Sequence, residues 1–292
     1  MKKIVIFFKL FGETTISLLR VLKNKSYLVK NKIPKNYGDK IFILGNGPSL
    51  NENLSNDIEL LKNNDTFCVN SFCFTDYFNA IKPKYYIFLD PRYFIKKNTD
   101  EKFLKLQEDV IESLIKNVTW NMKIFIPKQT DMKNQWSELQ KQNHNIEIIY
   151  FNTNPAYGFT SIKHFLFKRN LAMPRGQNVL IGAIYLSINM AYKNIYLLGA
   201  DHSWIKDLRV NSKNQLLLVD KHFYSEENRL FYKDTASTEL WKMHEILKIW
   251  AITFQMYREL ELYARKSRVD VINLTKESYI DSFRKEDIKC LI

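Results

Sequence analysis

Residues 41–50 read Ile-Phe-Ile-Leu-Gly-Asn-Gly-Pro-Ser-Leu, and this stretch decides the fold. The first four residues form a continuous apolar run, which is typical of a parallel strand buried on both faces. The Gly-Asn-Gly turn that follows lets a ligand approach the backbone closely. Pro48 fixes its own φ, and Ser49 is placed to cap a following helix. The stretch therefore predicts a strand that runs through a tight turn into a helix.

Such a strand-to-helix turn presents backbone N–H groups to an anion, so it predicts a phosphate or nucleotide site. The predicted site residues here are Gly45, Asn46, Gly47, Pro48 and Ser49. The pattern is neither Gly-x-Gly-x-x-Gly nor a P-loop, because no Gly-Lys-Ser/Thr follows. An ordinary turn with a helix cap is the alternative.

Composition limits the partners that we expect. The chain has 292 residues, 46% of them hydrophobic, enough for one large α/β domain or two small ones. Its net charge of +13 fits nucleic acid, an anionic membrane surface or phosphorylated substrates. The lysines are scattered and no zinc-finger or RNP-type pattern is present, so we expect no nucleic acid partner. The 3 cysteines show no zinc spacing and are typical of a reduced, cytoplasmic chain.

The N-terminal residues 1–39 predict an amphipathic helix through Leu22, followed by a Lys- and Asn-rich linker. Lys9, Glu13 and Arg20 interrupt the apolar run, which is too short to span a bilayer and lacks a signal-peptide cleavage site. Two alternatives stay open for this helix. It lies on an anionic membrane surface, which would make the protein peripheral on the inner face of the cytoplasmic membrane, or it packs on the domain or on a partner chain in a homo-oligomer.

Apolar runs and amphipathic segments alternate from residue 40 onward. We expect strands over 41–44, 66–70, 84–89, 122–126, 146–150, 195–198 and 269–273, and helices over 54–62, 72–79, 100–116, 176–192 and 237–266. This alternation predicts an α/β fold with a Rossmann-like, mostly parallel sheet flanked by helices. The catalytic domain would span 40–275, with an irregular lid or acceptor region at 202–235 and a tail at 276–292.

Polar residues follow four of the predicted strands, namely Gly45–Ser49, Asn70, Asp90 and Asp201. Ligands of open α/β sheets bind beyond the carboxyl ends of the strands. The fold class alone would therefore bring these residues to one edge of the sheet.

Five segments in order resemble a known family: GNGPSL from residue 45, CVNSF from 68, FLDPRYF from 88, RGQNVLIGAIYLSINMAYKNIYLLGAD from 175 and KHFY from 221. They resemble the bacterial lipooligosaccharide sialyltransferases, which use CMP-activated sialic acid. They are also similar to relatives described as 6-hydroxymethylpterin diphosphokinase-like. The resemblance covers about residues 40–225.

The resemblance implies roles for individual residues. The candidate catalytic residues are His222, Arg175 and Tyr224, and the candidate nucleotide- or donor-binding residues are Gly45, Asn46, Gly47, Pro48, Ser49, Asn70, Asp90, Gln177, Asn178, Gly199, Asp201 and His202. The resemblance carries over Gly45, Asn46, Gly47, Ser49, Asn70, Arg175, Asp201 and His222, and the others are candidates from their place beside these residues or at a strand end. His222 falls on the position of the family's general base. A histidine suits that task because its ordinary pKa of about 6.5 lets it take the proton of an attacking sugar hydroxyl.

Three positions depart from the sialyltransferase pattern. Asp90 replaces an Asn, Gln177-Asn178-Val179 replaces Thr-Ser-Gly, and Ser203 replaces an aromatic residue. Asp90 is also what the diphosphokinase-like group carries, where a carboxylate can hold Mg²⁺. No Asp-x-Asp pair is present, so a transfer that requires no cofactor is expected, with Mg²⁺ only in the alternative.

The sequence therefore favours an inverting glycosyltransferase of bacterial surface-polysaccharide or lipooligosaccharide synthesis. It would move a sugar, most simply a CMP-activated sialic-acid-like sugar, to a glycan or glycolipid acceptor. A Mg²⁺-dependent diphosphokinase acting on a pterin-like alcohol is one alternative. A non-catalytic nucleotide-binding module is the other.

Overall fold

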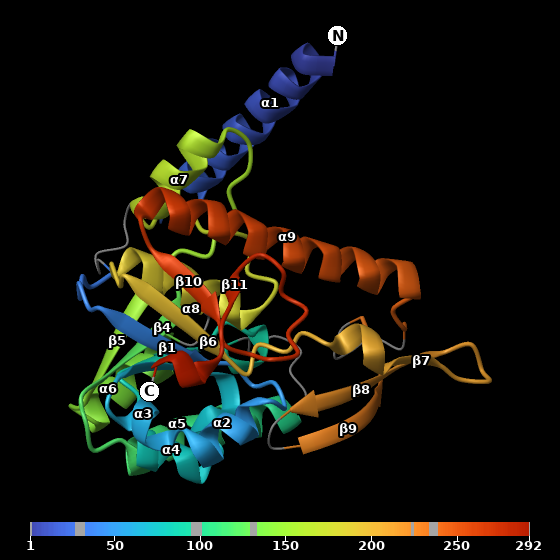
Figure 1. Cartoon of the computed structure of the whole chain (residues 1–292). Helices are drawn as coiled ribbons and strands as arrows, with labels where there is room; N and C mark the ends of the chain where they lie inside the picture. The colour runs from blue at the N-terminus through green and yellow to red at the C-terminus, as the bar shows by residue number, and fades with distance from the viewer. Residues whose placement is uncertain are drawn as a thin grey trace.

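A computed structural model describes residues 2–26, 33–94, 101–128, 133–222, 225–233 and 239–291. Side chains are described for these residues except Lys2, Lys133, Asn134 and those between 219 and 229. The α/β class predicted from the sequence is confirmed (Figure 1).

Within the described residues, an eight-stranded sheet has the strand order β11-β10-β6-β1-β2-β3-β4-β5, and each pairing is parallel. Its strands are β1 (Lys40–Leu44), β2 (Asp65–Val69), β3 (Tyr85–Ile87), β4 (Met122–Pro127), β5 (Ile146–Phe151), β6 (Asn194–Leu198), β10 (Asp270–Asn273) and β11 (Arg284–Lys285). The order reverses direction beside β1, between β6 and β2. Open α/β sheets bind ligands at such a switch point.

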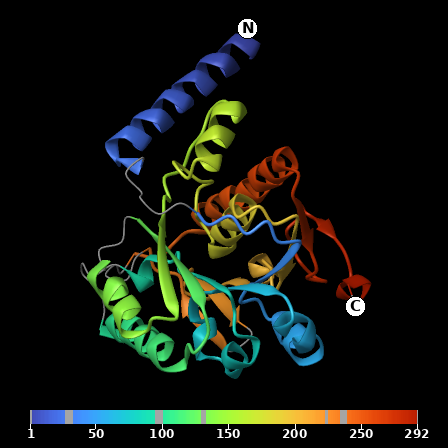
Figure 2. The same cartoon turned by 90° about the vertical axis from the view of Figure 1, so that its left-hand side faces the viewer.

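Helices cover both faces of this sheet (Figures 1 and 2). The α-helices are α1 (Lys2–Lys23), α2 (Leu50–Asn56), α3 (Ile58–Lys62), α4 (Asp76–Ile81), α5 (Glu101–Asn117), α6 (Lys133–Gln142), α7 (Thr160–Lys168), α8 (Val179–Asn189) and α9 (Met243–Ser267). Four short 3₁₀ helices, η2 (Asn70–Phe74), η3 (Pro91–Tyr93), η4 (Trp204–Asp207) and η5 (Ile288–Leu291), complete the helical segments described.

Successive residues of β1 face opposite cores, as the period of a strand requires. Ile43 packs with α8 and α9 on one face, whereas Phe42 and Leu44 pack with α2 to α6 on the other. All three side chains are fully buried, which explains why the strand is a continuous apolar run.

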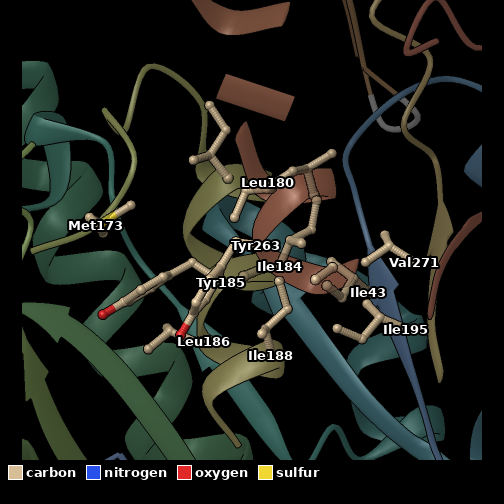
Figure 3. Packing of buried hydrophobic residues seen from close by; sticks show 14 of the residues in the cluster. Ile43, Met173, Leu180, Ile184, Tyr185, Leu186, Ile188, Ile195, Tyr263 and Val271 are labelled. Carbon is tan, nitrogen blue, oxygen red and sulfur yellow. The ribbon is translucent and has the colours of Figure 1, made fainter. Parts of the chain in front are cut away.

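Helix α8 is apolar on every side because it is buried on every side. Ten of its eleven residues, Leu180 to Asn189, are buried. Figure 3 shows Ile184 and Ile188 directed toward Ile43 and Ile195 of the sheet, with Tyr263 of α9 nearby. The helix therefore sits between the sheet and α9, and its N-terminus is fixed in place by this packing.

A second, antiparallel sheet replaces the irregular region that the sequence predicts over 202–235. It consists of β7 (Leu208–Val210), β8 (Leu216–His222) and β9 (Ser225–Leu230) in that order. Leu216 and Leu218 pack on Ile246 and Trp250 of α9, which explains how so polar a segment is held against the body.

Other predicted boundaries are also corrected. The helix expected over 54–62 is two helices, α2 and α3, interrupted at Asp57. Asn178 caps α8, so that helix is shorter than the predicted 176–192, and α9 begins only at Met243. The predicted tail 276–292 belongs to the fold, since its strand β11 pairs with β10.

Helix α1 confirms the N-terminal helix and shows which of its sides faces the protein. Its small and polar residues contact the body: Thr14 and Ser17 are buried and bond to the loop before α7, and Arg20 donates to Pro155 O at 2.8 Å. Large apolar residues point outward, with Ile4 and Phe8 61% and 66% exposed. Figures 1 and 2 show α1 projecting from the body with α7 beside it. None of the described helices is long and apolar enough to cross a bilayer.

The packing of α8 predicts a large and specific loss of stability for Ile184→Ala. The side chain is fully buried, so its loss leaves a cavity and is expected to cost about 2–5 kcal/mol of unfolding free energy. Urea unfolding measures this change. Leu247→Ala on α9, where the side chain is 42% exposed, is the matched control and should stay within about 0.5 kcal/mol of wild type. Equal effects of the two substitutions would contradict the description of α8.

Candidate functional site

A cleft with two connected chambers opens beyond the carboxyl ends of β1, β2, β3 and β6. The described lining of the inner chamber is Asn46, Gly47, Pro48, Asn70, Asn178, Val179, Leu180, Gly199, Asp201, His202, Ser203, Trp204 and Asp207. The described lining of the outer chamber is Asn70, Leu89, Asp90, Pro91, Arg92, Gly176, Gln177, Asn178, Val179, Trp204, Leu218, Phe231 and Trp250. Their volumes are about 110 Å³ and 320 Å³. The sheet thus brings together most of the residues singled out in the sequence.

Backbone contacts lock the turn after β1 against the turn after β6. Gly45 N donates to Leu198 O at 2.8 Å, and Gly47 N donates to Gly199 O at 2.9 Å. A Cβ atom at Gly45 would lie 2.4 Å from Gly199 O, so no larger residue fits there. Gly199 itself has a φ of +63°, a conformation that favours glycine. These glycines are therefore explained by the close approach of two backbones.

A side-chain contact extends this lock by one residue. Asp201 accepts from Ser49 Oγ at 2.8 Å and from Ser49 N at 3.2 Å. Burial raises the pKa of the Asp201 carboxyl, although the bonds from Ser49 oppose that shift. Ser49 makes no side-chain cap on α2, so the predicted cap is wrong: its hydroxyl serves Asp201 instead.

The contacts of this turn limit which of its N–H groups a ligand can reach. The N–H groups of Gly45, Gly47 and Ser49 all donate to groups of β6 or of the turn that follows it. They are consequently not presented to a phosphate. A ligand in the cleft would therefore meet the side chains of the turn rather than these three N–H groups.

Two asparagines, Asn46 and Asn70, line the inner chamber. The side-chain oxygens of Asn46 and Asn70 are buried, and no described group donates to either. Asn70 has a left-handed backbone with a φ of +51°, held in place by Tyr86, whose hydroxyl donates to Asn70 O at 2.6 Å. Buried oxygens without a donor are costly, but these two atoms have almost no accessible surface, so neither is presented to the open cleft.

His202 is built into the cleft wall as a neutral imidazole. It is buried, its φ is +54°, and burial lowers its pKa to about 3. His202 Nε2 is hydrogen-bonded to the Tyr257 hydroxyl at 2.6 Å, and the same hydroxyl lies 3.3 Å from Asn178 Oδ1. This chain of bonds joins the end of β6, the N-cap of α8 and helix α9. His202 therefore fixes the wall and is a weak base at neutral pH.

Trp204 lines both chambers. Its ring lies against His202 on one side and Trp250 on the other, with centroid distances of 4.3 Å and 5.6 Å. The sequence alone allowed Trp204 to line an acceptor site or to plug the core. In the structure Trp204 is half-buried and forms part of the wall of the cleft.

One arginine, Arg92, is among the described lining residues of the outer chamber, and a second, Arg175, directly precedes the lining residue Gly176. Arg92 donates from Nε and Nη2 to Asp90 Oδ2 at 3.0 Å and 2.8 Å, so the carboxylate predicted for donor or Mg²⁺ contact is paired with a cation. Arg175 is exposed and stands three residues before the N-cap of α8, where its guanidinium contacts the Gln177 amide. Across the described residues, no cluster of three or more His, Cys, Asp or Glu side chains is arranged to hold a metal.

Of the two residues implied for the acceptor side, His222 and Tyr224, the structure describes only the backbone of His222. His222 is the last residue of β8 and pairs with Ser225, four residues beyond Leu218, which lines the outer chamber. Its side chain and the whole of Tyr224 lie outside the described residues. Figure 1 shows β8 running from the far end of the small sheet back toward the α/β body.

Leu218, Phe231 and Trp250 complete the outer chamber, and sequence reasoning missed all three. Leu218 belongs to β8, Phe231 directly follows β9, and Trp250 lies in α9, the element that follows the small sheet in the chain. Only the apolar run Leu216-Leu217-Leu218-Val219 gave a signal, which is consistent with a short strand.

Neither a family model nor a curated protein sequence matches the chain. Among solved structures, the chain is similar to the MAf glycosyltransferase from Magnetospirillum magneticum AMB-1, with a TM-score of 0.49 and 13% sequence identity. The alignment covers 90% of this chain and 36% of that protein, so the chain spans about a third of its length. The similarity between the two proteins concerns the path of the backbone.

His202 predicts a specific dependence of stability on pH. Its pKa is about 3 in the folded chain and about 6.5 when unfolded. Below pH 6.5 the unfolded chain binds a proton that the folded chain does not, so stability falls as the pH decreases. Between pH 6.5 and 5 this contributes a loss of about 2 kcal/mol, at 1.36 kcal/mol per pKa unit.

His202→Asn, which the left-handed backbone tolerates, should therefore lose about 2 kcal/mol less than wild type over this pH range. Urea unfolding at several pH values gives the change of the unfolding free energy with pH for each protein. Because only this change is compared, a difference in stability between the proteins at the starting pH does not affect the result. His144→Asn, in an exposed loop, is the matched control. Parallel pH profiles for wild type and His202→Asn would show that the imidazole is not buried neutral.

Proposed function

We propose that the chain is a glycosyltransferase that moves a sugar from a nucleotide-activated donor to a glycan acceptor. The observation that carries this proposal is the cleft at the switch point of a parallel sheet, where four strand ends contribute Asn46, Asn70, Asp90 and Asp201. Aromatic side chains and a few convergent polar groups are typical of a small-molecule site. The motif resemblance supports a CMP-linked, sialic-acid-like donor and an inverting transfer in surface-polysaccharide or lipooligosaccharide synthesis.

Arg175 favours an acidic donor. Its guanidinium contacts a neutral amide, and the described residues provide it with no carboxylate. A planar guanidinium binds a phosphate or a sugar carboxylate in a bidentate manner. Asp90, by contrast, is already held by Arg92, so a Mg²⁺ ion would have to compete with an arginine for it. These two observations favour glycosyl transfer over the diphosphokinase alternative.

His222 is the proposed general base, and Tyr224 the proposed contact to the leaving phosphate. The base must take the proton of the acceptor hydroxyl as the new glycosidic bond forms and the donor's bond to phosphate breaks. His202 is unsuited to this role because its pKa of about 3 makes it a weak base. His222, on the hairpin of β8 and β9, is therefore the histidine that we propose as the base on the acceptor side.

His222→Ala should therefore lower turnover by about 10²–10⁴-fold and leave nucleotide affinity unchanged, since a base acts on the acceptor. His202→Ala should lose much less. The assay is release of CMP from a CMP-activated sialic-acid-like donor in the presence of a glycan acceptor, with affinity measured by calorimetry. The reverse ranking of the two variants would move the base to His202. No turnover by wild type with such donors would contradict the proposed function.

We further propose that α1 attaches the protein to an anionic membrane surface, which would bring it to a glycolipid acceptor. Residues 4–8, Ile-Val-Ile-Phe-Phe, are all more than half exposed, although the Phe7 ring lies 5.6 Å from the ring of Phe159. A helix at a lipid interface buries its apolar residues among the headgroups, which supports a lipid surface as the partner of this segment. Lys3 and Lys9 flank this segment, and a basic residue near an anionic surface contributes on the order of 1 kcal/mol.

Ile4→Asp combined with Phe8→Asp should abolish sedimentation with phosphatidylglycerol-containing vesicles, because a carboxylate in the interface is both hydrophilic and repelled. Raised salt should weaken binding by wild type. The matched control is Ile205→Asp combined with Val210→Asp, which alters exposed apolar residues of the small sheet. If wild type stays in the supernatant and sediments as a dimer by ultracentrifugation, α1 is an oligomer contact instead.

A further inference from the structure

We propose that a groove between α5 and α6 is a docking site for a partner protein, and that the partner inserts an amphipathic helix with lysine or arginine beside an apolar stripe. The groove has a volume of about 560 Å³. It is distinct from the cleft, since none of its described lining residues lines either chamber. The inference therefore goes beyond the proposed function and does not depend on it.

The floor of the groove is apolar and comes from both helices. Ile111 and Ile115, one turn apart, line it from α5, and Leu139 lines it from α6. Leu139 is fully buried, whereas Ile111 and Ile115 are half-buried, so apolar surface stays in contact with solvent. The lining residues of α5 lie within 107–116, which at about 1.5 Å per residue gives a length of about 14 Å, or about two and a half helical turns.

Carboxylates outnumber cations along the groove. Glu108 and Glu112 of α5 and Glu138 of α6 are exposed, and Lys116 is the lysine of the described lining. Within the described residues, Glu108 and Glu112 form no ion pair, and they stand four positions apart on one helix, where like charges repel. Glu138 is 3.2 Å from Lys141, an exposed ion pair that contributes little. The groove is therefore locally acidic in a chain whose net charge is +13.

These two features define the chemistry of the partner. We expect a helix, because the ridges of side chains on one helix fit the groove between two others. An extended peptide would instead add to a sheet edge, and the described lining of this groove comes from helices alone. We expect lysine or arginine on its flanks, because these cations relieve the repulsion between Glu108 and Glu112. The same carboxylates disfavour a nucleic acid or an anionic membrane surface.

The groove lies away from the N-terminal helix and beside the cleft. Figures 1 and 2 show α5 and α6 at the end of the molecule opposite α1, so a membrane surface at α1 would leave the groove accessible. Gln107, which belongs to the lining of the groove, donates from Nε2 to Arg92 O at 2.8 Å, and Arg92 lines the outer chamber. The partner would thus bind next to the cleft.

Two labelled peptides of about 14 residues, or about four helical turns, test the proposal. Both carry leucine at every third or fourth position, and the positions beside the leucines are lysine in one peptide and glutamate in the other. Wild type should bind the lysine peptide, and raised salt should weaken this binding. The glutamate peptide should bind about 10-fold more weakly or not at all, because its charges repel those of the groove. Fluorescence anisotropy measures both affinities.

Glu108→Lys combined with Glu112→Lys should reverse this preference. Binding of the lysine peptide should fall by about 5-fold or more, since two attractions at exposed sites become repulsions, and binding of the glutamate peptide should rise. Both positions are exposed, so the fold should tolerate the change. The matched control is Glu101→Lys combined with Asp109→Lys, which changes the net charge of the same helix equally at exposed residues outside the described lining. It should change both affinities by less than about 2-fold.

Four results overturn the proposal. The first is no binding of the lysine peptide by wild type. The second is equal weakening by the groove variant and by its control, which would mean that net charge alone attracts the peptide. The third is undiminished binding of a lysine peptide in which serine replaces each leucine, because the apolar floor would then play no part. The fourth is self-association of wild type that the groove variant abolishes, which would assign the groove to a second copy of the chain. None of these results bears on nucleotide binding, so the proposed function would stand.

Discussion

The contact between the turn after β1 and the turn after β6 is the constraint on which the rest of the site depends. Two glycine turns approach so closely that a Cβ atom at Gly47 would lie 2.6 Å from Gly199 O. Ser49 and Asp201 bridge the same two turns. On the far side of Asp201, Tyr279 N donates to its carbonyl oxygen, so the C-terminal segment supports the same turn. This contact uses the N–H groups of Gly45, Gly47 and Ser49 within the protein, so these donors are not available to a ligand.

The two ends of the cleft differ in charge and in hydrogen-bonding character for reasons that trace to this lock and to α8. Near this contact, Asn46, Asn70 and Asp201 line the cleft, and burial lowers the pKa of His202 so that it is neutral. At the other end, the packing of α8 fixes the position of its N-cap, and Arg175 lies three residues before it. The proposed ligand, a nucleotide sugar, combines hydroxylated rings with an anionic phosphate.

The parallel sheet could be predicted because its strands are buried on both faces, which makes residues 41–44 and 195–198 apolar without interruption. The gathering of Asn70, Asp90 and Asp201 at one edge followed from the fold class alone. The role of the glycines could not be predicted, because Gly45 is required by its contact with the backbone of Gly199, more than 150 positions away in the chain. The small sheet was missed because its buried face is supplied by α9, and the pairing of Asp90 with Arg92 depends on side-chain geometry that a sequence does not record.

The central claim is that the cleft binds a nucleotide whose phosphate needs no divalent metal. Thermal unfolding with CMP, CDP, UDP, GDP and ATP, each with and without Mg²⁺, tests it most directly, since a ligand that binds only the folded chain raises the unfolding temperature. The account predicts a rise with CMP that is the same with EDTA as with Mg²⁺. A rise with ATP that requires Mg²⁺, and none with CMP, would contradict it.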